Sequence, residues 1–285
     1  MSYEPISLKH KDILKDRLQS VSVPISEYSF PNLYLFRKAH DYEVFQFEGE
    51  YYVRGKSYDG YTYIMPTKDM RTCDIDTLFK LQKECDFFFP IHESWLEHFK
   101  KYDIEYSFSD GDTDYVYTSE KMQLYPGRKL HKKRNLLKQF KENYEAVAYE
   151  ISPERLDDCK YILDKWIEVS GLTKEETDYY ACSEALEQYN DLCICGGIYY
   201  ANDDPIGFII GEELTDDTYV LHFAKGLTSY KGIYQYLYND FANILPKRYE
   251  YINFEQDLGK VALRMAKTSY IPDMLAKKYR MILRG

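Results

Sequence analysis

The stretch that decides the fold is residues 193–213, CICGGIYYANDDPIGFIIGEE. Two mostly apolar runs, 193–201 and 205–213, flank the triplet Asn202-Asp203-Asp204. Asn and Asp favour turns because their short side chains hydrogen-bond the neighbouring backbone and tolerate left-handed conformations. The sequence therefore predicts a β-hairpin over these residues.

The same alternation of strands and helices continues on both sides of this hairpin. Before it, residues 146–151 predict a strand, and Ser152-Pro153 predicts a helix start with Ser at the N-cap and Pro in the first turn. A second helix is expected over 183–192. After the hairpin we expect, in order, a strand, a helix, a strand, a helix and an extended segment: 219–224, 230–245, 251–256, 260–268 and 275–283.

The first half of the chain repeats the later part of that order. Its expected elements are strands at 43–47, 51–55 and 61–65, a helix at 76–84, a strand at 86–90, a helix at 94–102, and strands at 105–109 and 115–118. A repeated pattern favours two like domains over one large irregular one. We therefore expect a mixed α/β protein with domains at 1–127 and 146–285, joined by a helix at 128–145.

Composition removes several classes of protein. The chain has 285 residues and a formal net charge of −10, which argues against general coating of nucleic acid. It shows neither a secretory leader nor an apolar stretch long enough to span a bilayer, so a cytoplasmic location is expected. Its six cysteines have no C-x-x-C spacing, so no metal site is expected. Motifs of hydrolases, metalloproteases, kinases and dehydrogenases are missing from the sequence.

Three stretches carry a resemblance to a known family. They are DDPIGFI at 203–209, KLHKKRNLL at 129–137, and NFEQDLG at 253–259, the last continuing to LRMAKTSYIP at 263–272. The first resembles a recurring strand of GNAT acyltransferases. Together they resemble the C-terminal domain of phosphatidylglycerol lysyltransferases and the Fem aminoacyl-transferases, over roughly residues 20–283. The resemblance implies two tandem GNAT-like domains.

The resemblance also implies a function. It implies an acyltransferase that moves an aminoacyl group from aminoacyl-tRNA to an amine or hydroxyl acceptor, by direct attack and without a cofactor. Two alternatives remain open: an acyl-CoA-dependent N-acyltransferase, and a catalytically inactive tandem module that binds a ligand or protein. The lysyltransferases also carry a membrane-spanning half that is missing from this sequence, so a lipid acceptor does not follow. Peripheral membrane contact is possible.

The loop that binds acyl-CoA in GNAT enzymes is altered in this sequence. The corresponding residues 229–234 read SYKGIY, and only Gly232 fits the pattern. Small residues are needed there because backbone N–H groups must approach the pyrophosphate closely. Tyr234 stands where a small residue is expected, so acyl-CoA is not the favoured donor. The resemblance further implies that backbone N–H groups from Phe223 to Lys225 stabilise the oxyanion of the reacting carbonyl.

A basic segment starts the second half. Residues 128–141 contain seven Lys and Arg residues and no acidic residue. Clustered cations of this kind bind phosphate backbones, so the candidate contacts to tRNA are Lys129, Lys132, Lys133 and Arg134. The alternative interpretation is a solvated face of a helix.

The candidate catalytic residues lie near the end of the chain. On the strand expected at 251–256 and just beyond it, Asn253, Glu255 and Asp257 would share one side. Two neighbouring carboxylates can have separated pKa values, so Glu255 or Asp257 is a candidate general base and Asn253 a substrate contact.

The next helix supplies two candidate cations and a candidate acid. Arg264 and Lys267 share a face of the helix and can bind a phosphate or carboxylate of the substrate. Alternatively, they only pair with the carboxylates and fasten helix to strand. Tyr270 can protonate a leaving group or simply pack in the core.

Overall fold

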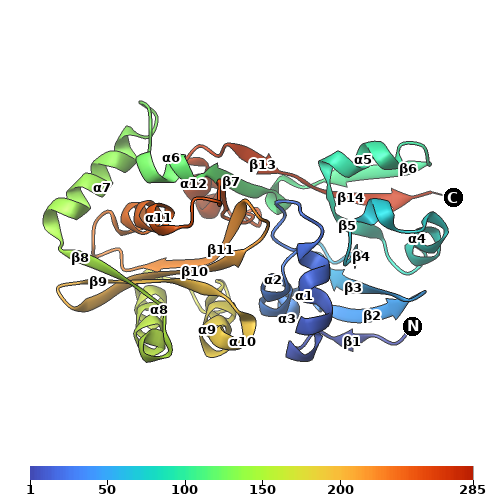
Figure 1. Cartoon of the computed structure of the whole chain (residues 1–285), viewed down its shortest axis with the longest axis horizontal. Helices are drawn as coiled ribbons and strands as arrows, with labels where there is room; N and C mark the ends of the chain where they lie inside the picture. Colours follow the sequence, from blue (N-terminus) through green and yellow to red (C-terminus); the bar gives the residue numbers. More distant parts are fainter. Residues whose placement is uncertain (285) are drawn as a thin grey trace. The chain divides into compact units, whose positions relative to one another are not determined.

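The computed structural model describes residues 1–284 and forms two compact units (Figure 1). The first unit contains residues 1–115, 255–265 and those from Met274 onward, and the second contains 116–254 and 266–273. No helix within residues 1–284 combines the length and apolar character needed to cross a membrane.

The first unit is built on a mixed sheet. Its strands are β1 (Glu4–Pro5), β2 (Glu43–Phe47), β3 (Glu50–Lys56), β4 (Thr62–Pro66), β5 (Phe87–His92), β6 (Ile104–Phe108) and β14 (Lys278–Leu283). Its helices are α1 (Lys11–Gln19), α2 (Phe30–Leu35), α3 (Arg37–His40), α4 (Ile75–Gln82) and α5 (Glu93–Phe99). The strand order is β1-β2-β3-β4-β5-β14-β6, and only β4 and β5 are parallel, with α4 between them in the chain.

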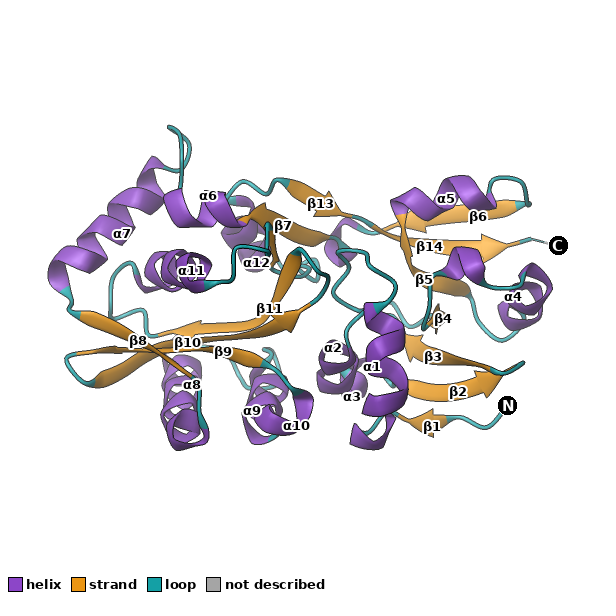
Figure 2. Cartoon of the chain, in the orientation of Figure 1, coloured by secondary structure: helices purple, strands orange, loops and turns teal. Residues whose placement is uncertain are grey.

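The second sheet is also mixed. Its strands are β7 (Asp114–Thr118), β8 (Ala146–Glu150), β9 (Cys195–Ala201), β10 (Asp204–Glu213), β11 (Thr218–Gly226), β12 (Tyr251–Asn253) and β13 (Met274–Ala276), in the order β13-β7-β12-β11-β10-β9-β8. The remaining helices are α6 (Ser119–Leu124), α7 (His131–Asn143), α8 (Leu156–Ser170), α9 (Tyr179–Glu187), α10 (Tyr189–Leu192), α11 (Ile233–Ile244) and α12 (Val261–Thr268). Helices α7 and α11 lie on one face of the β8–β11 strands, and α8, α9 and α10 on the other (Figure 2).

The predicted class, two mixed α/β sheets covered by helices, is confirmed. The deciding hairpin forms as β9 and β10, which pair antiparallel across the predicted turn. The basic segment forms helix α7, and Leu130 at its N-cap and Phe140 within it are buried as its apolar spacing predicts.

The last strand departs from the expected domain ranges. β14 lies between β5 and β6 and pairs antiparallel with both, so it belongs to the first sheet. The expected domain 146–285 would have placed it with the second sheet. Hydrophobic periodicity identifies a strand, but it does not identify the sheet that receives it.

The strand expected at 251–256 is shorter than predicted. β12 ends at Asn253, and the backbone then turns through left-handed conformations at Glu255 (φ 59°), Leu258 (φ 55°) and Gly259 (φ 71°). The prediction that Asn253, Glu255 and Asp257 share one strand face is therefore wrong. Strand alternation cannot extend through residues with positive φ.

Candidate active site

In the second unit, β11 and β12 are parallel partners over a short stretch. The pairing runs from Thr218 with Tyr251 to Val220 with Asn253. β12 ends there, whereas β11 continues to Gly226. Beyond Val220, β12 therefore offers no backbone partner to β11.

The direction of the N–H groups along β11 follows from its pairing with β10. The Leu227 N–H donates to the Ile206 carbonyl, and N–H groups of an antiparallel strand face alternate sides. The N–H groups of Lys225 and Phe223 therefore face β10, and that of Ala224 faces the side on which β12 ends. The resemblance implied N–H groups from Phe223 to Lys225, and within that range the alternation makes Ala224 the donor toward the side on which β12 ends.

The side chain of Lys225 is buried and held by two partners. Its ammonium lies 2.5 Å from the Asp178 carboxylate and 3.8 Å from the centre of the Trp166 ring. Asp178 immediately precedes α9, so the ion pair links β11 to the start of that helix. This cation therefore stabilises the second unit, and sequence reasoning missed both partners.

Gly232 lies at the start of α11, under helix α7. Its φ is 91°, and a Cβ at this position would overlap the Leu136 carbonyl oxygen of α7. One turn further, the rings of Phe140 and Tyr236 stack with their centres 4.4 Å apart. Helix α7 therefore packs directly against the first turn of α11.

The four predicted anion-binding cations divide into two pairs. Lys129 and Lys132 are exposed. Lys133 is half-buried, its ammonium lies 3.8 Å from the centre of the Tyr270 ring, and burial lowers its pKa. Arg134 donates to the backbone carbonyls of Tyr125 and Gly127, the latter at 2.7 Å. Lys133 and Arg134 are thus engaged in the fold, and only the first pair faces solvent.

Tyr270 and Lys267 also have structural partners. The buried Tyr270 hydroxyl accepts a hydrogen bond of 2.8 Å from the Gln235 side chain, and burial raises the pKa of Tyr270. The raised pKa makes it a weaker proton donor and favours the core interpretation. Lys267 donates to the Phe254 carbonyl at 2.6 Å, which fastens α12 to the end of β12.

In the first unit, Asp257 is a fully hydrogen-bonded buried carboxylate. Arg264 donates to both of its oxygens, at 2.7 and 3.2 Å, the Tyr115 hydroxyl donates at 2.7 Å, and the Gly259 N–H at 2.8 Å. Burial acts against its charge, but these donors outweigh burial and lower the pKa of Asp257. A carboxylate held in this way is a poor general base. The geometry favours the alternative in which Asp257 and Arg264 fasten the loop to the helix.

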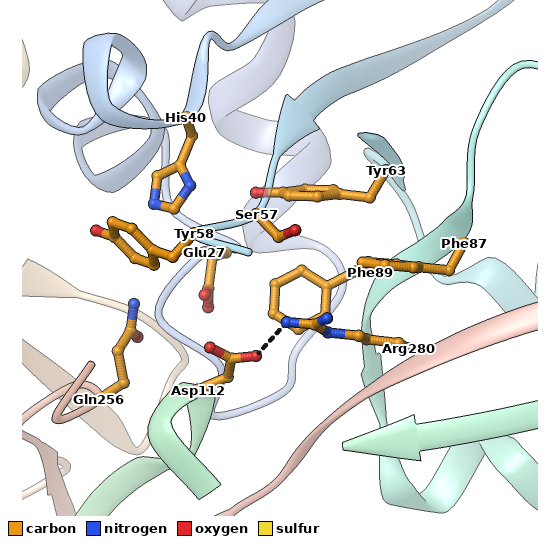
Figure 3. Close-up of a pocket in the computed structure, with 10 residues that line it drawn as sticks. All are labelled: Glu27, His40, Ser57, Tyr58, Tyr63, Phe87, Phe89, Asp112, Gln256 and Arg280. Atoms are coloured by element: carbon orange, nitrogen blue, oxygen red, sulfur yellow. Dashed lines mark hydrogen bonds and ion pairs between the residues drawn. The ribbon is translucent and has the colours of Figure 1, made fainter. Parts of the chain in front are cut away.

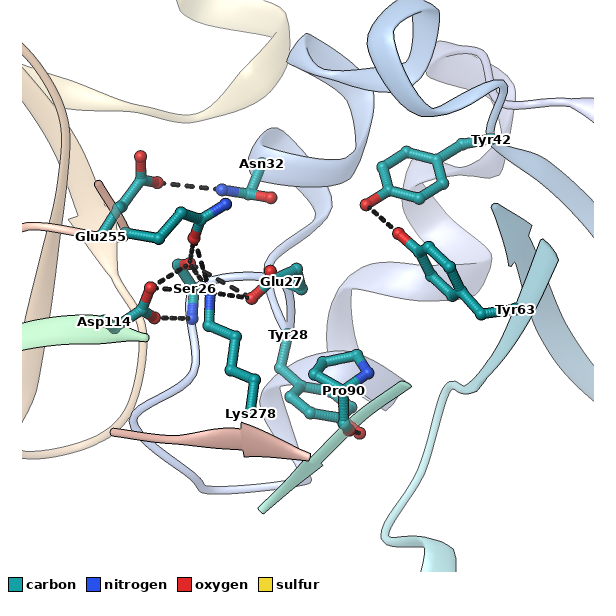
Figure 4. Close-up of polar contacts among 11 residues, drawn as sticks. Ser26, Glu27, Tyr28, Asn32, Tyr42, Tyr63, Pro90, Asp114, Glu255 and Lys278 are labelled. Carbon is teal, nitrogen blue, oxygen red and sulfur yellow. Dashed lines mark hydrogen bonds and ion pairs between the residues drawn. The ribbon is translucent and has the colours of Figure 1, made fainter. Parts of the chain in front are cut away.

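Glu255 has a different hydrogen-bond partner from those of Asp257. Its carboxylate accepts a 2.9 Å hydrogen bond from the Asn32 side chain (Figure 4). Asn253 is buried within β12, where it pairs with Val220 on one side and Val116 on the other. The two predicted carboxylates therefore do not act as a pair.

The most heavily charged buried cluster lies in the first unit and surrounds Lys278 (Figure 4). The Lys278 ammonium is inaccessible to solvent and lies 2.6 Å from Glu27 and 2.7 Å from Asp114. It also donates to the Gln256 side chain at 2.6 Å and to the Ser26 hydroxyl at 3.2 Å. Two carboxylates thus share one cation in the core.

This excess of negative charge affects Glu27. Burial, with Asp114 as a smaller contribution, raises the pKa of Glu27 from its ordinary 4.5 to about 7, although Lys278 acts in the opposite direction. Burial alone would lower the pKa of Lys278, but Asp114 and Glu27 raise it.

Two small cavities of about 20 and 50 Å³ lie beside this cluster. Both are lined by Glu27, His40, Tyr58 and Gln256, and we call them together the Glu27 pocket. Figure 3 shows the Glu27 carboxylate among the other lining side chains. A more open cavity of about 430 Å³ shares Tyr58 with the pocket and is also lined by Arg264 and Arg280. Arg280 forms ion pairs with Asp59 at 2.6 Å and Asp112 at 3.3 Å.

Sequence reasoning missed the Glu27 pocket. One signal was available, because Glu27 is the only charged residue between Arg17 and Arg37, in an otherwise apolar and small polar stretch. A single carboxylate in such a stretch indicates a buried charge with a distant partner. The partner, Lys278, lies far away in the sequence and has no such signal.

Comparisons with known proteins agree with this architecture. Residues 20–282 match the family described as "Phosphatidylglycerol lysyltransferase, C-terminal". An uncharacterised protein of Mycoplasmoides gallisepticum is 27% identical over 199 residues, which is 66% of this chain and 61% of that protein. The match thus spans less than two thirds of that relative's length.

Solved structures share the fold along the whole chain. A conserved protein of unknown function from Bacteroides thetaiotaomicron superposes with a TM-score of 0.85 at 24% identity, covering 100% of both chains. L-PGS from Bacillus licheniformis gives 0.63 at 13% identity, covering 100% of this chain and 95% of that one. FemX gives 0.63 at 9% identity, covering 100% and 98%. The chain therefore belongs to the family of phosphatidylglycerol lysyltransferase C-terminal domains, with the tandem GNAT-type fold of acyltransferases.

Proposed function

We propose that this acyltransferase moves an aminoacyl group from aminoacyl-tRNA to an amine or hydroxyl acceptor, without acyl-CoA. The observation that carries the proposal is the packing of α7 on the first turn of α11. That turn is where a GNAT enzyme offers free N–H groups to the CoA pyrophosphate. Here Gly232 is covered by the Leu136 carbonyl, and a bulky Tyr234 follows.

The same helix supplies a surface for a different anionic donor. Lys129 and Lys132 are exposed on or just before α7, with Arg128 exposed beside them. Clustered exposed cations bind a phosphate backbone without reading its sequence. In this proposal, one position of α7 both crowds the first turn of α11 and presents cations to solvent.

The reaction needs little from the protein beyond orientation and electrostatic support. The acceptor nitrogen or oxygen attacks the ester carbonyl carbon, the bond from that carbon to the ribose oxygen breaks, and the acceptor proton is finally carried by the ribose hydroxyl. The Ala224 N–H, directed toward the side where β12 ends, is the proposed donor to the developing oxyanion.

The experiment is a transfer assay with aminoacyl-tRNA carrying a labelled amino acid, with hydroxylamine as a general acceptor. We expect protein-dependent release of the labelled hydroxamate that acetyl-CoA does not inhibit. Filter binding of the tRNA at several salt concentrations should give a steep salt dependence. The pair Lys129→Ala and Lys132→Ala should reduce that slope by about two.

A matched control is Lys160→Ala with Lys165→Ala, an exposed and a half-buried lysine of α8, on the other face of the sheet. The control should keep the slope of the original protein. Binding that responds neither to salt nor to the α7 substitutions would exclude this surface. Saturable micromolar binding of acetyl-CoA would instead support the acyl-CoA alternative.

A further inference from the structure

Two side chains that can accept hydrogen bonds, Glu27 and His40, line both cavities of the Glu27 pocket. The Glu27 carboxylate forms its ion pair with Lys278 and its hydrogen bond with Ser26 through one oxygen, Oε2. The carboxylate also lines both cavities of the pocket. Its side chain is only 6% exposed, so a ligand there would meet a charge that is weakly screened by water.

His40 contributes a second acceptor. Its Nδ1 lies 2.8 Å from the Lys56 carbonyl oxygen, which can only accept, so Nδ1 carries the proton. The Nε2 of the neutral ring is then an acceptor, and within residues 1–284 no side chain or backbone group hydrogen-bonds to it. His40 is 9% exposed and lines both cavities. Burial lowers its pKa, which favours the neutral form.

Aromatic rings form much of the remaining wall. The His40 ring stacks on Tyr42 at 5.1 Å, and the edge-on Tyr58 ring lies 4.7 Å away. Tyr58 is 59% exposed and lies in the loop between β3 and β4. Ring faces attract cations, and an aromatic wall beside a carboxylate is typical of ammonium-binding sites.

We propose that the Glu27 pocket binds a primary ammonium group, which donates hydrogen bonds to Glu27 and to Nε2 of His40. An anion would be repelled by Glu27. In the smaller cavity Asp112 is paired with Arg280, which lines the same cavity, so the ammonium is placed in the larger one, where the charged lining residues are Glu27 and Glu255. A neutral hydroxyl has one proton to donate, whereas an ammonium has three and a charge that complements the carboxylate. The larger of the two cavities in the Glu27 pocket, about 50 Å³, has room for an alkylammonium head but not for an aromatic ring.

Two chemical sources of the ammonium are considered: an acceptor amine, or the amino group of an aminoacyl residue. The inference rests on the proposed function only for this choice. Binding itself is measured on the protein alone, without tRNA, so failure of transfer and failure of binding are separate results.

The test is a titration of the isotope-labelled intact protein with methylammonium chloride, followed by backbone amide chemical shifts. Potassium chloride at equal ionic strength and methanol are the charged and neutral reference probes. We expect saturable chemical-shift changes around the Glu27 pocket with methylammonium, and none with potassium or methanol. Glu27→Gln should weaken binding about tenfold or more, because a charge-assisted hydrogen bond is lost. The exposed, non-pocket substitution Glu97→Gln should leave binding unchanged.

Tyr58→Leu provides a second variant that does not disturb a buried charge. Loss of its ring should weaken binding by about two- to fivefold. Glycine ethyl ester binding more tightly than ethylammonium would identify the aminoacyl residue as the source, and equal binding would identify the acceptor amine. Equal shifts with methanol or potassium, or unchanged binding in both Glu27→Gln and Tyr58→Leu, would overturn the proposal.

Discussion

Replacement of Glu27 by Gln should stabilise the first unit at alkaline pH and have little effect near pH 5. Lys278 already has Asp114 as a partner, so an ionised Glu27 adds an unmatched negative charge to the core. Its pKa rises from 4.5 to about 7, and each pKa unit corresponds to about 1.4 kcal/mol. Ionisation of Glu27 in the folded state therefore costs about 3 kcal/mol relative to the unfolded chain.

The direction of the effect follows from proton binding. Because the folded pKa is above the unfolded one, the folded state holds more protons between pH 4.5 and 7. The contribution of Glu27 to stability is fully present below pH 4.5 and is lost as the pH rises through 7. Gln cannot ionise, so the advantage of the variant should grow by about 2–3 kcal/mol between pH 5 and pH 8.

Urea denaturation followed by tryptophan fluorescence can isolate the first unit. The chain has two tryptophans, Trp95 in α5 and Trp166 in α8, so a Trp166→Phe background leaves Trp95 as the reporter. The free energy of unfolding of Glu27→Gln is compared with that of the background at pH 5, 6.5 and 8, with Glu97→Gln as the exposed control. A loss of stability that is the same at all three pH values would refute the reasoning and show that Lys278 requires both carboxylates.

Two further substitutions test structural roles. Asp257→Asn should lower the stability reported by Trp95 by about 2 kcal/mol, since it removes the charge that Arg264 binds in a buried loop; an unchanged urea midpoint would contradict that role. Gly232→Ala should lower the stability reported by Trp166 by more than about 1 kcal/mol, because φ is positive and the Leu136 carbonyl leaves no room. A midpoint equal to that of the original protein would show that α7 does not press on α11.

Local sequence patterns predicted the elements well but their long-range arrangement poorly. The hairpin at β9 and β10 and the helix α7 follow from turn chemistry and helical spacing, which act within a few residues. The placement of β14 depends on which sheet has an open position, and no property of residues 278–283 encodes that. The repeated order of strands and helices predicted a mixed α/β protein of two like domains, and the family resemblance added that these domains are of the GNAT type.

The candidate site was predicted only in part, for a similar reason. Glu255 and Asp257 are two residues apart, so strand alternation predicted a pair, but positive φ at Glu255 rotates them apart. Lys133 and Arg134 were expected to bind an external anion, yet a ring face and two backbone carbonyls bind them within the chain. The Glu27 pocket joins residues separated by most of the sequence. The isolated carboxylate of Glu27 indicated a buried charge, but no property of the sequence identified Lys278 as its partner.

The position of β14 has a consequence for synthesis on the ribosome. The first unit begins at the start of the chain, but its sheet has a gap between β5 and β6 until residues 278–283 have emerged. Until then, two strand edges stay open and Glu27 and Asp114 lack their shared cation. More than 150 residues separate β6 from β14. At a synthesis rate of about 5–20 residues per second, this interval lasts on the order of ten seconds or more. The unit whose synthesis begins first is therefore completed last. We expect chaperones to bind its open strand edges during this interval.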